Sequence, residues 1–362
     1  MNRAGGFDGE RAVLALSGGI GGAKLALGLY RVLPPDALTV VANTGDDFEH
    51  LGLRISPDID TLLYTLCGQD NPELGWGRRG ETWTFMAALE ALGGETWFRL
   101  GDGDLATHVE RTRRLAAGES LAAITDDFRR RFGIAARLLP MSDDPVRTRL
   151  RISSTVIPAP GRPALAGRSG GDPEAAPAEG RVKPGHDGSA EGNWLDFQDY
   201  FVRQRCAPAV SEIAFAGAAA ARPHPDVVAA LSDPRLRAVV VCPSNPFISI
   251  DPILSLPGLR GALRECPAPV VAVSPIIGGA AVKGPTAKMM RELGLPVGAA
   301  AVARHYGDLL DLYVADEVDA REVRELDVPV VLSRTLMQSL ADREALARMV
   351  VDAAARTPKR RR

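Results

Sequence analysis

The stretch AVLALSGGIGGAK, residues 12–24, joins a short apolar run to a glycine-rich turn. Apolar residues then recur with helical spacing from Leu25 to Leu33, and two prolines follow. A strand, a glycine turn and a helix in this order make the first unit of a doubly wound sheet. The stretch therefore predicts an α/β, Rossmann-like fold with a mostly parallel sheet.

Three further apolar runs, at residues 38–43, 238–242 and 269–274, support this prediction. They are continuous, as is typical of parallel strands buried on both faces. Small or polar residues follow each run, and ligands of such sheets bind beyond the carboxyl ends of the strands. We therefore expect these turns to meet in one cleft.

The chain is expected to divide into a core and a smaller inserted part. Residues 58–133 show mainly helical spacing, which predicts a lid-like helical subdomain, while residues 1–57 and 134–362 form the nucleotide- or phosphate-binding core. Within the core, residues 161–193 are rich in Gly, Pro, Ala and Ser. Such a segment buries too little apolar surface to order itself, so we expect a flexible loop insertion.

Composition narrows the class of protein. The 362 residues carry a net charge of -2, and no apolar run is long enough to span a bilayer. We therefore expect a cytoplasmic protein with neither nucleic acid nor membrane as a partner. Four cysteines stand far apart in the sequence, which favours reduced, structural thiols over a metal or disulfide role.

The glycine turn is a candidate phosphate site. Backbone N–H groups at a helix N-terminus bind anions, and the glycines let a phosphate approach them. Lys24 is followed by Leu25 and not by Ser or Thr, so the turn is not a Walker A loop. A tight turn that merely needs glycine is the alternative. The segment after Gly278 resembles a second anion cradle, with Lys283 as a phosphate partner.

Three pairs of aspartates suggest a metal site. They stand in turns marked by glycine or proline: Asp46 and Asp47, Asp58 and Asp60, Asp102 and Asp104. Carboxylates gathered around a phosphate would suit Mg²⁺, which prefers oxygen ligands. Independent helix caps are the alternative interpretation. His108 could be structural or catalytic, and Trp76, between two glycines, could be a core residue or a stacking wall for a flat ligand.

Six segments resemble, in order, the signatures of the 2-phospho-L-lactate transferase family. They are VVANTGDD (40–47), ISPDIDT (55–61), LGDGDLATH (100–108), LPMSDDPV (139–146), CPSNP (242–246) and VSPIIG (273–278). The resemblance extends from about Val13 to Asp316. It implies transfer of a phosphorylated three-carbon acid from its guanosine diphosphate conjugate to the ribityl hydroxyl of the deazaflavin Fo. GMP leaves, and the product is a precursor of coenzyme F-420.

The resemblance also implies roles for single residues. Asp46 and Asp60 are expected to bind Mg²⁺, and Asp60 or Asp102 to accept the proton of the hydroxyl. The guanosine diphosphate is expected along Gly18, Gly19, Gly21, Gly22, Ser244, Asn245 and Lys283. The deazaflavin is expected against Asn43, Asp58, Trp76 and His108. A homodimer is expected from the resemblance alone.

Two alternatives stay open at this point. A related family shares the Gly-Gly loop and consists of non-catalytic regulators that bind nucleotides or nucleotide sugars. An NAD-dependent dehydrogenase would need a cleaner glycine fingerprint than this turn provides. The sequence does not distinguish phospholactate, phosphoenolpyruvate and 3-phosphoglycerate as the acid that is transferred.

Overall fold

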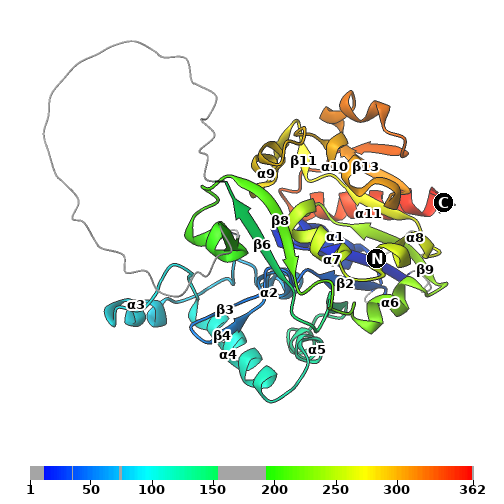
Figure 1. The fold of residues 1–362 in the computed structure, drawn as a ribbon. Coiled ribbons are helices and arrows are strands. Elements are labelled where there is room, and N and C mark those ends of the chain that lie inside the picture. Colours follow the sequence, from blue (N-terminus) through cyan, green and yellow to red (C-terminus); the bar gives the residue numbers. More distant parts are fainter. Residues whose placement is uncertain (1–11, 35, 73–75, 154–192, 361–362) are drawn as a thin grey trace, which may run out of the picture.

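The computed structural model describes residues 12–34, 36–72, 76–153 and 193–360. Its centre is a sheet of seven strands that all pair in parallel (Figure 1). In spatial order the strands are β14 (Val330–Ser333), β13 (Leu312–Asp316), β10 (Val270–Val273), β9 (Leu236–Val241), β1 (Ala12–Ser17), β2 (Leu38–Ala42) and β5 (Arg137–Pro140). The predicted Rossmann-like sheet is thus confirmed.

The order of the strands reverses beside β1. The chain runs from β1 outward through β2 to β5, and then returns to the other side of β1 with β9. Beyond the carboxyl ends of such a pair the loops diverge and leave a crevice, which is where open α/β sheets bind ligands.

Each face of the sheet has its own hydrophobic core. Because successive strand residues point to opposite faces, Val13 and Ala15 enter one core while Leu14 and Leu16 enter the other. The first core includes residues of α1 (Gly19–Val32), α2 (Pro57–Leu66), α5 (Leu121–Arg131) and α11 (Leu340–Arg356). Glycine 28 permits the close crossing of α1 and α11, since a Cβ there would collide with the backbone of Arg343.

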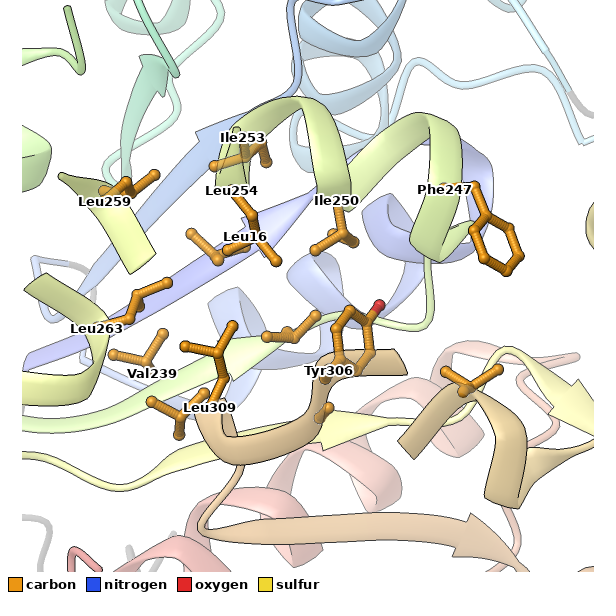
Figure 2. Packing of buried hydrophobic residues seen from close by; sticks show 14 of the residues in the cluster. Leu16, Val239, Phe247, Ile250, Ile253, Leu254, Leu259, Leu263, Tyr306 and Leu309 are labelled. Atoms are coloured by element: carbon orange, nitrogen blue, oxygen red, sulfur yellow. The ribbon is translucent and has the colours of Figure 1, made fainter. Parts of the chain in front are cut away.

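The second core lies on the opposite face. Leu16 and Val239 of the sheet pack there against side chains that include Ile253, Leu263 and Tyr306 (Figure 2). Its elements are η2 (Pro246–Ile250), α6 (Pro225–Leu231), α7 (Asp251–Leu254), α8 (Leu259–Glu265), α9 (Thr286–Glu292), α10 (Ala299–Tyr306), η3 (Gly307–Leu309) and η5 (Glu322–Glu325).

A small antiparallel sheet adds to this second core. It is formed by β6 (Arg147–Ile152) between β7 (Trp194–Asp196) and β8 (Val210–Ala216), as expected for strands on either side of an insertion. The π-helix η1 (Asp199–Arg203) follows β7. Of the expected insertion 161–193, only Asn193 is among the described residues. The remaining short elements are β11 (Ile276–Ile277), β12 (Ala280–Ala281) and η4 (Glu317–Asp319).

Only some of residues 58–133, the expected helical subdomain, have a hydrophobic core separate from those of the main sheet. Helices α2 and α5 pack with α1 against the main sheet, because Ile59, Leu63 and Phe128 belong to the core of that face. A separate cluster of Ile55, Met86 and Leu100 joins the hairpin of β3 (Phe48–His50) and β4 (Leu53–Ile55) to α3 (Thr84–Ala91) and α4 (Asp102–Ala116). Figure 1 shows these elements to one side of the main sheet.

Within the described residues, no helix is both long and apolar enough to cross a membrane.

Candidate functional site

A cavity of about 850 Å³ opens at the carboxyl ends of β1 and β9. The turn Gly18–Gly21 forms one part of its wall, and the loop Pro243–Asn245 after β9 forms another. Residues 282–286, before and at the start of α9, also line it. The strand-end turns expected to meet in one cleft therefore do so. All the residues expected along the guanosine diphosphate except Gly22 lie on this wall: Gly18, Gly19, Gly21, Ser244, Asn245 and Lys283.

The glycines of the turn serve two different purposes. Gly18 exchanges two hydrogen bonds with Ser244: its N–H donates to Oγ (3.1 Å), and the hydroxyl donates to its carbonyl (2.7 Å). A Cβ at Gly21 would lie 2.5 Å from the carbonyl oxygen of Pro243, and one at Gly22 would collide with Ser244. These glycines are required for close packing of the two loops. Gly19 has φ +62° and lines the cavity, and a Cβ there would meet only Ser249 Oγ, at 4.0 Å.

The N-terminus of α1 already holds a carboxylate. The N–H of Gly19 donates to Asp58 Oδ1 (2.7 Å), and the Asn43 amide donates to Asp58 Oδ2 (2.9 Å). Burial raises the pKa of Asp58 to about 6. Asp58 lines the cavity, but the fully buried Asn43 does not; its amide connects Asp58 to the turn at Gly45. Asn43, which was expected to contact a deazaflavin, therefore supports the cavity wall from behind in this structure.

Asp46 is a buried carboxylate on the cavity wall. Burial raises its pKa well above the ordinary value, and the nearby charge of Asp58 raises it further. Its Oδ1 has no hydrogen-bond partner in the described part of the chain. An unpartnered buried oxygen beside a second carboxylate is an incomplete site that a cation would complete.

A second acidic group centres on Asp60. Arg111 of α4 donates to both of its carboxylate oxygens, at 3.1 Å to Oδ2 and by a close contact to Oδ1. Arg111 also faces His108 Nδ1 at 3.3 Å, and since a guanidinium only donates, a hydrogen bond here requires Nδ1 to accept. Nε2 lies 3.1 Å from Asp104 Oδ2, and the Tyr64 hydroxyl donates to Asp104 Oδ1 (2.6 Å).

This group lines the cavity through its acidic and imidazole side chains. Asp60, Asp104 and His108 are all on the wall, and one ligand atom of each lies within 4.8 Å of the others. The sequence analysis named Asp60 and His108 individually and Asp104 only as a member of the aspartate pairs that could bind a metal, and it did not identify Arg111. For Asp104 the signal was its spacing of four residues from His108, which brings both side chains to one helix face.

Asp102 is placed differently from its expected role. It does not line the cavity. Its carboxylate accepts from the Thr82 hydroxyl (2.5 Å) and from the N–H groups of Thr84 and Phe85 (both 3.0 Å), at the start of α3. Glu81 accepts in return from the N–H groups of Gly103 and Asp104 at the start of α4 (2.6 and 2.9 Å). The two segments cap each other's helices, so the capping interpretation applies here.

Aromatic side chains form another part of the wall. They come from outside the main sheet: Tyr64, Trp76, Trp97, Phe98, Phe197 and Phe201. Trp76 is 42% exposed and meets Trp83 edge-on at 6.3 Å between centroids. It is therefore no core residue, and it lies where a flat ligand could stack.

Basic side chains on the wall were mostly missed by the sequence analysis. Besides Lys283, they are Lys24, Arg99 and Arg205. The Lys24 ammonium donates to the Met337 carbonyl (3.0 Å), and its pKa is lowered by burial first and by nearby cations second. Arg99 lies over the Trp83 ring at 4.1 Å. Neither arginine stands in a recognisable motif, so only the tertiary structure reveals them.

Comparisons with known proteins agree with this arrangement. Residues 13–354 match the family model described as 2-phospho-L-lactate transferase CofD. Among curated relatives, a phosphoenolpyruvate transferase of Streptomyces griseus is 38% identical, covering 93% of this chain and 95% of its own. Another, of Thermobifida fusca, is 40% identical over 86% and 88% of the two chains. One from Mycobacterium tuberculosis is 36% identical over 93% and 96%.

Comparison with solved structures supports the assignment of the fold. A UPF0052 family member from Bacillus halodurans superposes with a TM-score of 0.58, covering 96% of this chain and all of the other. At 12% identity this likeness concerns architecture alone.

Proposed function

The chain belongs to the 2-phospho-L-lactate transferase family of coenzyme F420 biosynthesis, and from this premise we propose that it transfers phosphoenolpyruvate to the deazaflavin Fo. The donor would be the guanosine diphosphate conjugate of that acid. The relatives named above carry the name phosphoenolpyruvate transferase, which favours this acid over phospholactate and 3-phosphoglycerate.

One observation carries the proposal. A single cavity joins two loops at the carboxyl ends of β1 and β9, where open α/β sheets bind nucleotides, to a wall of aromatic rings, which suits a deazaflavin. Two substrates of such different chemistry are what this transfer must bring together. Phosphoryl transfer needs mainly positioning and neutralisation of charge, and the basic side chains on the wall supply part of the latter.

Mg²⁺ fits the Asp46 side of the cavity better than the Asp60 side. Arg111 already neutralises Asp60, which leaves Asp104 as the one carboxylate of that group free to attract a second cation. Asp46 and Asp58 share no such partner, and Asp46 Oδ1 is unsatisfied. We therefore assign the metal to Asp46 with Asp58, in place of the expected Asp46 and Asp60. Bound there, the ion would neutralise phosphate charge, usually with water and phosphate completing its shell.

Asp60 is the remaining candidate for the proton acceptor, because the other candidate, Asp102, is outside the cavity. The ribityl oxygen forms a bond to the phosphorus that carries the acid. The bond from this phosphorus to the bridging oxygen breaks, GMP leaves with that oxygen, and the hydroxyl proton passes to the Asp60 carboxylate. Arg111 holds both oxygens of Asp60 and so orients it for this step.

The test is turnover of Fo with the three guanylylated donors side by side, with product and GMP separated by chromatography. We expect the phosphoenolpyruvate conjugate to be preferred and EDTA to abolish turnover. Asp60→Asn should lower kcat by about 10²- to 10⁴-fold, the usual contribution of general base catalysis. Asp102→Asn is the matched control and should keep most activity, since Asn also caps helices. Binding of GDP and Fo without any turnover would instead support a non-catalytic regulator.

A further inference from the structure

Arg205 has an unusual backbone conformation for its residue type. Arg205 and Cys206 both have left-handed φ, at 50° and 57°. L-residues other than glycine rarely adopt this conformation, because Cβ approaches the following carbonyl oxygen. The pair follows η1, where the N–H of Cys206 donates to the Tyr200 carbonyl (2.9 Å). Glycine is the usual residue in this conformation at the end of a helix, so an arginine here is unfavourable for stability.

The side chain of Arg205 explains why an arginine could be retained. It lines the cavity, and it has no carboxylate partner within the described residues. Arg203, two residues earlier, is a contrast: it pairs with Glu95 (3.3 Å) and Asp199 (3.1 Å), lies over Trp97, and is not part of the wall. Among the described residues, one arginine is therefore satisfied internally, and the other lines the cavity without a carboxylate partner.

We propose that Arg205 is a binding residue for an anionic group of the donor, either a carboxylate or a phosphate. A guanidinium matches both groups through two parallel hydrogen bonds. The left-handed backbone is then a local loss of stability retained at a binding site, as such outliers often are. This inference rests on the proposed function, in which the donor is the substrate that carries phosphates and a carboxylate.

Three variants separate binding from strain. Arg205→Gly removes the guanidinium and relieves the backbone, whereas Arg205→Ala removes the guanidinium and keeps the left-handed residue. Arg205→Lys keeps the charge but loses the planar fork. Leu51→Gly is the matched control: Leu51 is also left-handed (φ 53°), stands in the β3–β4 turn and is not part of the cavity wall.

The readouts are the urea midpoint, the KM of the guanylylated donor and the Kd of GDP by calorimetry. We expect Arg205→Gly and Arg205→Ala to raise the donor KM about tenfold or more, as for loss of a charged hydrogen bond, with Lys intermediate. The midpoint should rise for Arg205→Gly and Leu51→Gly but not for Arg205→Ala. Leu51→Gly should leave the KM unchanged.

The GDP titration identifies the anionic group. If GDP binding weakens together with donor binding, Arg205 contacts a phosphate; if only the donor is affected, it contacts the carboxylate. An unchanged donor KM in both Arg205→Gly and Arg205→Ala, in a protein whose wild type turns over, would overturn the inference. A wild type with no turnover of any of the three donors would contradict the proposed function instead.

Discussion

Arg111 is a fully buried guanidinium, and replacing it tests the acidic group around Asp60 directly. The change we consider is Arg111→Met, which keeps much of the side-chain length and removes the charge. The two side chains of the pair are 1% and 7% exposed, so the carboxylate left behind could not be rehydrated without rearrangement. Removing one partner of a buried ion pair typically costs about 3–5 kcal/mol.

The cost converts to a measurable change of Tm. With an unfolding entropy of about 2.1 cal/mol/K per residue, 362 residues give about 0.76 kcal/mol per kelvin. The variant should therefore unfold about 4–7 °C below the wild type in calorimetry. The double variant Arg111→Met/Asp60→Asn removes both charges of the pair, so it should be more stable than the sum of the two single changes predicts.

Arg113→Met is the matched control on the same helix. Arg113 pairs with Glu110, but the two side chains are 65% and 44% exposed. Exposed ion pairs contribute little, so this change should leave the Tm close to that of the wild type. The reasoning is refuted if Arg111→Met is as mild as Arg113→Met, or if the double variant shows simple additivity.

Three further outcomes are expected. Gly21→Ala should lower the free energy of unfolding, measured in urea, by about 1–3 kcal/mol, because its Cβ meets the Pro243 carbonyl. Gly261→Ala on α8, with open space around it, should be neutral or stabilising, and equal effects of the two changes would contradict the packing role of Gly21. Burial raises the pKa of Asp47 to about 7, so the folded state binds its proton more tightly than the unfolded state. In EDTA, the wild type should therefore lose stability relative to Asp47→Asn as pH rises from about 4 to 7, and parallel pH curves would show that this shift is absent. Burial raises the pKa of all four thiols, those of Cys67, Cys206, Cys242 and Cys266. Iodoacetamide at pH 8 should therefore modify them slowly in the native protein, and rapid labelling would contradict this expectation.

Roles of residues that depend on partners far away in the sequence could not be predicted from local sequence patterns. An Asp in a glycine turn suits a helix cap as well as a catalyst, and only the mutual capping by Glu81 shows which applies to Asp102. Arg111 and Arg205 stand in no recognisable motif, yet one holds Asp60 and the other lines the cavity. The expected homodimer stays a prediction.

The sequence by itself determined the α/β class, the first strand–turn–helix unit and the meeting of the strand-end turns. These features depend on local patterns: apolar runs form buried strands, and parallel strands bring their carboxyl ends to one edge. Only the tertiary structure decided which carboxylates are already neutralised and which oxygens lack a partner. Asp60 faces Arg111 across 51 residues of chain, while Asp46 Oδ1 has no hydrogen-bond partner in the described segments. The charge balance of a site depends on such long-range contacts, which local patterns do not encode.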